Sequence, residues 1–444
     1  MAISRRTLLA GSAGGAITAL GATALPQAPA SAADGTTHLR SVTAVTQVYG
    51  DGQKLSHLVL RYDAEIDGRR LTTTTFQVAG RTITGVWTAD RPGIDEKRKS
   101  NAGRYVVLEL SLDDAAALLW VQLPGDGGAG PGGPVVGDTT PSHKVVPAAA
   151  SVVQAATVYT TRGSRYAASA AAVANTSTSN LIVDDFEQFS YADEATGLTL
   201  PYHLFAPRGY DRRRSYPLVL FMHDASVVAG GPLSPLAQGT GAVVWAGPGD
   251  QARHECFVLA PAYPAIVIDD DYEPSAYFDT TINLVNWLTE RYPIDRRRLH
   301  ATGQSMGAMM SLGMNIRHPG LFASSYIVAG QWPADQAGPL AGQKLWVCVS
   351  QGDTKAYPGI TAIVEEIEPL GAEVTSATWS GAATRAEFRA DVAAMEAAHA
   401  DVNFASFTPG TLPGTASGGN GGSEHTSTWR VAYDIPGIRD WILR

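Results

Sequence analysis

The second half of the chain alternates short apolar runs with longer helical patterns, and this alternation restricts the possible folds more than any other feature. Residues 217–222 are all apolar, which is typical of a strand buried on both faces. We predict further strands at 256–260, 299–303, 324–329 and 344–350, and helices at 277–291, after Ser305 and at 359–369. This pattern predicts an α/β fold with a mostly parallel sheet and helices on both sides. Functional groups of such sheets lie at the carboxyl ends of the strands.

A G-x-S-x-G motif, Gly303-Gln304-Ser305-Met306-Gly307, lies where a predicted strand meets a predicted helix. Glycine permits the tight backbone that such a turn requires. A serine at this turn stands clear of the sheet, and the helix N-terminus directs backbone N–H groups toward it. The motif predicts Ser305 as a nucleophile for acyl transfer, with an acid and then a histidine to follow in the chain.

The expected acid is Asp353, which follows the predicted strand 344–350. A carboxylate there would accept the imidazole N–H of the base and stabilise its protonated form. Asp335, which follows the preceding strand, is the alternative candidate.

The expected base is His425, which follows the glycine-rich segment 418–422. Glycines allow a loop to reach over the sheet edge, and we expect a closing helix at 429–441. The imidazole would take the serine proton and deliver it to the leaving group. His318 and His399 are predicted at or on helices and are the competing candidates.

An oxyanion hole needs two N–H donors near the nucleophile. The backbone N–H of Met306 is the first candidate, and that of Ala225, in the loop after strand 217–222, is the second. We expect Gln304 and Trp332 to contribute to the substrate pocket, although Trp332 fits a packing role equally well.

An acidic run, residues 269–273, follows the predicted strand 256–260. Three interpretations stay open: a solvated loop, which is the usual role of a charge run, a rim that selects polar or cationic substrates, or, as the lesser option, a calcium site. Carboxylates alone do not set the geometry of a calcium site. With no cysteine–histidine spacing typical of zinc, we expect neither a metal nor a cofactor.

The first half has a different texture. Strand candidates at 55–62, 71–78, 105–110 and 152–159, separated by Gly- and Asp-rich turns, predict a small β-sandwich at 33–165. The Ala/Ser/Thr-rich segment 166–180 predicts a linker, and 181–444 the catalytic domain. The sandwich lacks a catalytic cluster, so it is interpreted as a packing module or a module that binds carbohydrate or polymer.

The N-terminus predicts an export signal. Arg5 and Arg6 form a twin-arginine pattern, a mildly apolar stretch follows, and Ala30-Ser31-Ala32 offers a cleavage site, so residues 1–32 are interpreted as a twin-arginine signal peptide. We therefore expect the twin-arginine export machinery as a partner, a secreted protein, and no membrane association after signal removal.

Composition agrees with an exported enzyme. The 444 residues are 45% hydrophobic, enough for a large core, and the net charge of −9 argues against nucleic acid as a partner. The two cysteines, Cys256 and Cys348, fall in predicted strands that are not neighbours in the usual strand order. We expect two buried free thiols.

Residues 181–444 resemble secreted esterases of the α/β-hydrolase superfamily, in particular polyhydroxybutyrate-depolymerase-like and feruloyl-esterase-like proteins, often called prolyl-oligopeptidase-like. The most specific part is Asp295-x-x-Arg298, the stretch 299–307, and a helix ending at His318-Pro319. The N-terminal part is similar to the immunoglobulin-like domain that precedes some of these esterases. The resemblance implies an α/β-hydrolase fold after an immunoglobulin-like sandwich, and a serine esterase acting on small-molecule or polymeric esters.

One position departs from that family. Its members usually have His-Gly after the strand that ends at Met222, whereas this chain has His223-Asp224. A side chain at that position is expected to narrow the turn that carries Ala225. Two alternatives to an esterase stay open: a peptidase of prolyl-oligopeptidase type, and a non-catalytic binding protein on a hydrolase scaffold.

Overall fold

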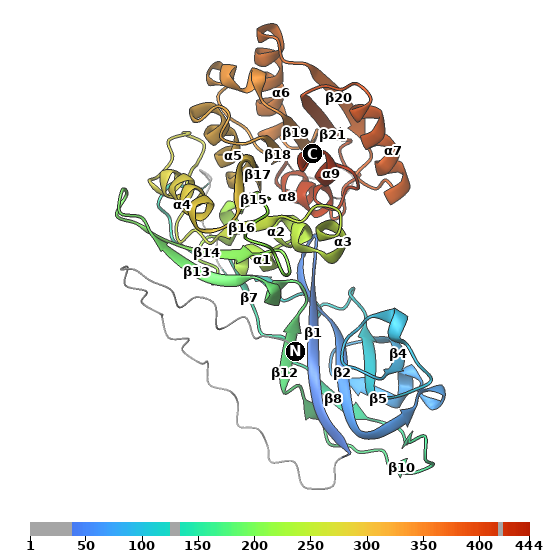
Figure 1. Cartoon of the computed structure of the whole chain (residues 1–444). Coiled ribbons are helices and arrows are strands. Elements are labelled where there is room, and N and C mark those ends of the chain that lie inside the picture. The colour runs from blue at the N-terminus through green and yellow to red at the C-terminus, as the bar shows by residue number, and fades with distance from the viewer. Residues whose placement is uncertain (1–37, 125–133, 416–420) are drawn as a thin grey trace. The chain divides into compact units, whose positions relative to one another are not determined.

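The computed structural model describes residues 38–124, 134–415 and 421–444. Within it, Leu39–Arg444 forms one compact unit that contains a β-sandwich and an α/β region (Figure 1). The predicted export signal, 1–32, lies outside the described residues, as do 418–420 of the glycine-rich segment before His425. None of the helices in the described ranges is both long and apolar enough to span a bilayer.

A nine-stranded sheet forms the centre of the α/β region (Figure 1). In spatial order its strands are β13 (Glu187–Ala192), β14 (Thr199–Phe205), β16 (Phe257–Pro261), β15 (Tyr216–Met222), β17 (Ile294–Gln304), β18 (Ser324–Val328), β19 (Leu345–Ser350), β21 (Val402–Phe407) and β20 (Val374–Trp379). Pairing is parallel from β16 to β20, and only β14 runs against its neighbours. The α/β fold with a mostly parallel sheet is therefore confirmed.

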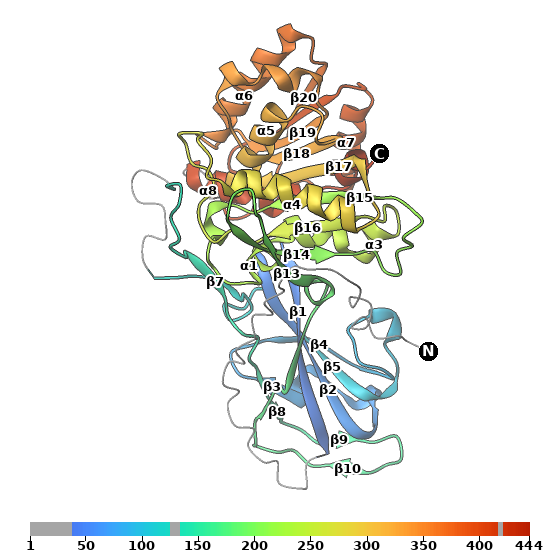
Figure 2. The same ribbon diagram turned by 60° about the vertical axis from the view of Figure 1, so that its left-hand side comes forward.

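Helices cover both faces of this sheet (Figure 2). Side chains of β15 alternate between two cores: Leu218 and Leu220 pack into one, Val219 and Phe221 into the other. The first core is covered by α4 (Tyr277–Arg291), α5 (Met306–Arg317) and α6 (Ala356–Ile367). The second is covered by α2 (Thr240–Val243), α7 (Arg385–Glu396), α8 (Gly421–Ala432) and α9 (Ile438–Ile442). Burial on both faces explains why the sequence of this strand is apolar without alternation.

The N-terminal sandwich encloses its own core, which includes Val42, Leu60, Phe76, Leu108 and Val152. One sheet has the order β12 (Ser177–Asn180), β1 (Leu39–Tyr49), β2 (Gly52–Asp67), β5 (Ala102–Leu110) and β4 (Ile83–Ala89). The facing sheet is β11 (Val173–Ala174), β8 (Ser151–Gln154) and β3 (Phe76–Val78). Two small two-stranded antiparallel sheets complete it: β6 (Trp120–Gln122) with β7 (His143–Val145), and β9 (Val158–Tyr159) with β10 (Arg165–Tyr166).

Two local expectations in this part are corrected. Segment 166–180 is not a free linker, because β11 pairs with β8 and β12 pairs in parallel with β1. Its small polar residues suit sheet edges, where backbone hydrogen bonds rather than bulky side chains hold the strand. In 71–78 only Phe76–Val78 is a strand, because the hydroxyls of Thr72 and Thr75 form a capping box around a 3₁₀ turn.

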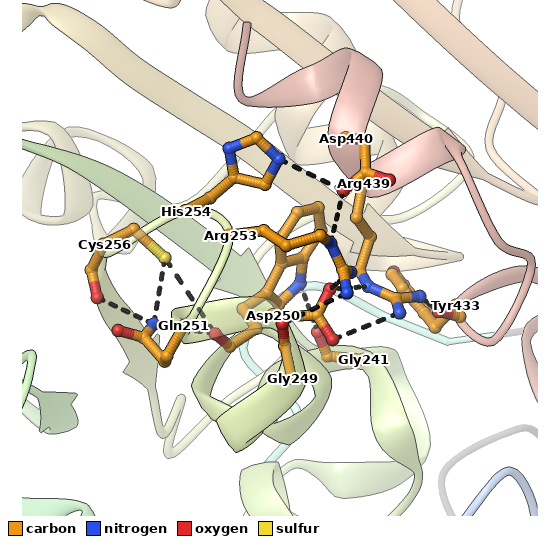
Figure 3. A network of polar contacts seen from close by, with 11 residues as sticks. Gly241, Gly249, Asp250, Gln251, Arg253, His254, Cys256, Tyr433, Arg439 and Asp440 are labelled. Atoms are coloured by element: carbon orange, nitrogen blue, oxygen red, sulfur yellow. Dashed lines mark hydrogen bonds and ion pairs between the residues drawn. The ribbon is translucent and has the colours of Figure 1, made fainter.

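The C-terminal segment is held onto the α/β region by a polar network (Figure 3). Arg439, which is 7% exposed, donates from Nε to Asp250 Oδ1 at 2.9 Å and from Nη1 to the carbonyl of Tyr433. Asp250 lies on α3 (Pro248–Gln251), and Arg253 just beyond it donates from Nε to Asp440 Oδ1 at 3.0 Å. These contacts anchor α9, which follows the helix carrying His425.

Both cysteines are free and buried, as expected. Cys256 lies just before β16 and Cys348 lies in β19, and three strands separate β16 from β19 in the sheet.

Candidate active site

Ser305 lies on the sharp turn between β17 and α5. Its backbone has φ 52° and ψ −118°, a conformation that non-glycine residues rarely adopt. The turn is held on both sides, since Ser305 N–H donates to Val328 O at 3.1 Å and Met309 N–H to Ser305 O at 2.9 Å. The side chain consequently projects at the carboxyl end of the sheet, where the G-x-S-x-G motif predicts it.

The two motif glycines are required by backbone contact with the neighbouring strand β15. A Cβ at Gly307 would lie 1.9 Å from Met222 O, and one at Gly303 would lie 2.7 Å from the same oxygen. Any side chain at either position would push the turn away from β15. The glycines therefore set the distance between the serine turn and the loop that follows β15.

Three side chains from distant parts of the chain meet above this sheet end. Ser305 Oγ lies 2.9 Å from His425 Nε2, and His425 Nδ1 lies 2.5 Å from Asp353 Oδ2. Because an ionised carboxylate only accepts, Nδ1 carries the proton and Nε2 is the acceptor for the serine hydroxyl. This is the arrangement that general-base activation of a serine requires.

Asp353 is oriented by the N-terminus of α6. Its Oδ1 accepts from Lys355 N–H at 3.1 Å and Ala356 N–H at 2.9 Å, which leaves Oδ2 for His425. Burial acts to raise the pKa of this carboxyl, but the hydrogen bond and charge of His425 and the two backbone N–H groups together lower it below its ordinary value. The alternative acid, Asp335, is exposed on a 3₁₀ turn.

His425 lies in the first turns of α8 and not on a loop. The closing helix predicted at 429–441 is in fact the end of α8 and the separate helix α9. His318 and His399, the competing candidates, are both exposed.

Glu424 was missed by the sequence analysis. Its carboxylate is 1% exposed and accepts from Ser350 Oγ at 2.6 Å and Gly410 N–H at 2.7 Å. These bonds tie the start of α8 to the end of β19 and to the loop after β21, next to His425. Its only sequence signal is an acidic residue directly before the histidine.

The two expected oxyanion donors line the same pocket as Ser305. Met306 is the first residue of α5, and Ala225 is the first residue of a 3₁₀ turn, η6 (Ala225–Val227). N–H groups at the first position of a helix have no acceptor within it. Both N–H groups therefore lack an acceptor within their own helix, and both belong to residues of the pocket lining.

Asp224 stands where the resembled family usually has glycine, directly before the turn that carries Ala225. It has an ordinary extended backbone, with φ −77° and ψ 169°, and its 4%-exposed side chain caps η6 by accepting from Ser226 N–H at 2.9 Å. Its other oxygen accepts from Gln304 Nε2 at 2.8 Å. Neither Asp224 nor Gln304 is among the residues that line the pocket.

The pocket beside Ser305 has a volume of about 310 Å³. Ile268, Met306, Met309 and Ala329 supply apolar walls, and Gln331 and Lys355 supply polar ones. Neither Gln304 nor Trp332, the two expected pocket residues, belongs to the lining. Trp332 is 2% exposed and packs against Gly313 and Tyr272, because the chain after β18 turns back over α5.

The acidic run lies at the rim of this pocket. Asp269 and Asp270 both line it, and Asp270 accepts from Gln331 Nε2 at 3.0 Å and from Lys355 Nζ. Asp269 Oδ2 accepts the N–H of Val136, from the segment that follows the sandwich strand β6, at 2.8 Å. In the described part of the chain, His, Cys, Asp and Glu side chains form no group of three that could hold a metal ion.

Comparison with known proteins agrees with the fold. Residues 41–167 match the model of the esterase Ig-like N-terminal domain, and residues 262–400 match that of the putative esterase family. The crystal structure of a thermostable esterase has 26% sequence identity and a TM-score of 0.75, and the alignment covers 91% of this chain and 99% of that chain. A ferulic acid esterase from Anaeromyces mucronatus has 14% identity and a TM-score of 0.38, with 58% of this chain and 92% of that chain covered. No curated protein matches the chain.

The fold and these matches define the class: the chain is a carboxylic ester hydrolase with an α/β-hydrolase fold. More narrowly, it is an esterase whose catalytic region follows an esterase-type Ig-like domain, as the resemblance in the sequence implies.

Proposed function

We propose that the chain is a serine esterase in which Ser305 is the nucleophile, His425 the general base and then acid, and Asp353 the residue that orients His425. The observation that carries this proposal is the pair of contacts at His425, 2.9 Å to Ser305 Oγ and 2.5 Å to Asp353 Oδ2. Ser305, Asp353 and His425 lie far apart in the chain, and they meet in the order and geometry that acyl transfer needs.

The reaction proceeds through an acyl-enzyme. Ser305 Oγ attacks the ester carbonyl carbon while its proton passes to His425 Nε2, and Asp353 stabilises the imidazolium. The N–H groups of Met306 and Ala225 donate to the oxyanion of the tetrahedral intermediate. Its collapse breaks the ester bond, and the departing alcohol takes the proton from His425. Water, activated by the same imidazole, then attacks the acyl-enzyme and releases the carboxylic acid.

The pocket favours a small ester. Its volume of about 310 Å³ is at the lower end for small-molecule sites, and Met306, Met309 and Ala329 give its lining an apolar part. We propose short-chain acyl groups as substrates.

The test is a panel of p-nitrophenyl esters from acetate upward, assayed with wild type and Ser305→Ala. We expect turnover of the short esters and loss of turnover on the order of 10⁴-fold or more in the variant. Retained turnover in Ser305→Ala would mean that the nucleophile is another residue. An aminoacyl-nitroanilide cleaved faster than the esters would instead support a peptidase. Failure of a fluorophosphonate to label Ser305 stoichiometrically would support a non-catalytic binding protein.

We also propose export through the twin-arginine route, on the strength of the Arg5-Arg6 pair and the small residues before Ala33. Expression of the full chain in a bacterium with that pathway should give extracytoplasmic esterase activity. Replacing both arginines by lysine should retain the activity in the cytoplasm, and unchanged export of that variant would refute the proposal.

A further inference from the structure

We propose that Asp224 and Gln304 are positioning residues that fix the oxyanion-donor turn against the nucleophile turn. The proposal rests on the proposed function, since it concerns the N–H of Ala225 and the hydroxyl of Ser305. Each residue of the pair is a direct neighbour of one of these groups: Asp224 precedes Ala225, and Gln304 precedes Ser305.

The two residues form a buried bridge between the adjacent strands β15 and β17. These strands pair in parallel up to Met222 and Gly303, and each bridging residue lies within two positions of that end. Asp224 Oδ2 accepts from Gln304 Nε2 at 2.8 Å, and the same amide donates to Gln238 Oε1 at 2.9 Å. Asp224 is 4% exposed and Gln304 1% exposed.

The other carboxylate oxygen of Asp224 holds the donor turn. It accepts from the N–H and the hydroxyl of Ser226, which places fixed contacts on both sides of Ala225. The carbonyl of Ser226 in turn accepts from Ser142 Oγ, in the segment leading into β7, at 2.9 Å. The donor turn is therefore held by β17 through Gln304 and by the sandwich segment through Ser142.

A buried carboxylate is costly unless its hydrogen bonds are satisfied, and here three donors satisfy it. A local turn needs only the Ser226 contact, so the additional bond to Gln304 links the turn to the nucleophile strand. An oxyanion donor acts only when it lies about 3 Å from the developing charge, and a displacement of about 1 Å costs on the order of 10²-fold in rate. The bridge sets this distance.

The test uses the full chain and compares Asp224→Ala, Gln304→Met and the double variant. We expect kcat for a p-nitrophenyl ester, per titrated active site, to fall on the order of 10- to 100-fold in each single variant, with KM within about twofold. The double variant should be no slower than the slower single variant, because both changes break one bridge. Affinity for an alkylboronic acid, whose adduct with Ser305 occupies the oxyanion site, should fall in parallel with kcat.

Ser324→Ala is the matched control. Ser324 is buried and hydrogen-bonded, and it is the first residue of β18, whereas the nucleophile turn contacts the last residue of that strand, Val328. Removing the Ser324 hydroxyl should therefore lower the melting temperature without changing kcat. If Asp224→Ala does not fold, Gln304→Met decides alone. Values of kcat within twofold of wild type in the folded variants, or losses that multiply in the double variant, would overturn the proposal. If Ser305→Ala abolishes turnover while the variants at Asp224 and Gln304 retain it, the positioning role of these two residues is refuted and the proposed serine esterase function stands.

Discussion

Ser305 has a backbone conformation that is unfavourable for any residue with a side chain, and its neighbours maintain it. The backbone hydrogen bonds to Val328 and Met309 hold the turn, and Gly303 and Gly307 allow it to approach β15. Strain of this kind persists only where the surroundings over-determine it. The position of the Ser305 hydroxyl therefore depends on the backbone contacts that hold this turn.

Gly307→Ala should destabilise the fold and reduce activity together. The new Cβ would lie 1.9 Å from Met222 O, so the serine turn must shift. We expect a loss of about 3 kcal/mol in unfolding free energy and of at least tenfold in kcat, measured by urea denaturation and ester hydrolysis. Gly249→Ala is the control, since a Cβ there meets nothing within 4 Å. Wild-type activity in Gly307→Ala would contradict the role assigned to this contact.

Asp353→Asn should lower kcat on the order of 10⁴-fold, because the amide no longer favours the Nδ1–H tautomer of His425. The pKa of Asp353 is lowered in the folded state by His425 and by two backbone N–H groups, despite its burial. Its charge therefore stabilises the fold above the unfolded pKa of about 4, and this contribution is lost as the pH falls through the folded value. In urea denaturation, the wild type should have a higher free energy of unfolding than Asp353→Asn at pH 7, and this difference should shrink below about pH 4. A difference that grows on acidification would refute the lowered pKa of Asp353 in the folded state.

At the scale of single elements, strand β17 carries a buried histidine, His300, that lies outside the site. His300, in β17, is only 1% exposed. The hydroxyl of Ser324 donates its proton to the carbonyl of Ile442, so its oxygen is left to accept a hydrogen bond from Nδ1 of His300, at 2.8 Å. Burial, together with the positive charge of Arg298, lowers the pKa of this imidazole to about 3. The central strand of the site is thus connected to the C-terminus through a histidine that stays neutral in the folded protein.

His300 should make the fold sensitive to mild acid. Its folded pKa lies below the unfolded value of about 6.5, so the unfolded state binds the proton first and stability falls as the pH drops below about 6.5. Between pH 7 and 5 this group accounts for about 2 kcal/mol of lost stability. His300→Asn, which can still bond Ser324, should remove that part of the pH dependence in urea denaturation. An unchanged pH dependence would show that His300 titrates equally in both states.

Across the whole molecule, separate segments converge on the end of the sheet that carries Ser305. The sandwich contributes Ser142 to the donor turn and the N–H of Val136 to Asp269 at the pocket rim. The C-terminal helix is held by Arg439 and Asp250, which Figure 3 shows together with Arg253 and Asp440. Arg439 also donates to the carbonyl of Tyr433, the residue that directly follows α8, so the same network contacts the end of the helix that carries His425.

Arg439→Met should cost about 3 kcal/mol in unfolding free energy, because it removes one partner of a mostly buried ion pair. Arg253→Met is the matched control: this side chain is 49% exposed, so its loss should cost less than about 1 kcal/mol. Thermal and urea denaturation of both variants test the difference. Equal effects would mean that burial does not distinguish the two pairs.

Residue patterns by themselves were sufficient for the α/β fold, the sandwich, and the three residues that meet at His425. Periodicity is a local property, and strand β15, helix α4 and the G-x-S-x-G turn each carry their signal within a few positions. The order Ser305, Asp353, His425 follows from where these residues stand relative to the predicted strands.

Tertiary contact decided what those patterns do not contain. The 166–180 segment became part of the sandwich because β1 and β8 offered free edges, and Gln304 turned toward Asp224 and away from the pocket. Glu424 acquired its partners from β19 and from the loop after β21, which lie 14 or more residues away. Such assignments depend on which distant groups satisfy a buried polar atom, and no local property of the sequence specifies that pairing.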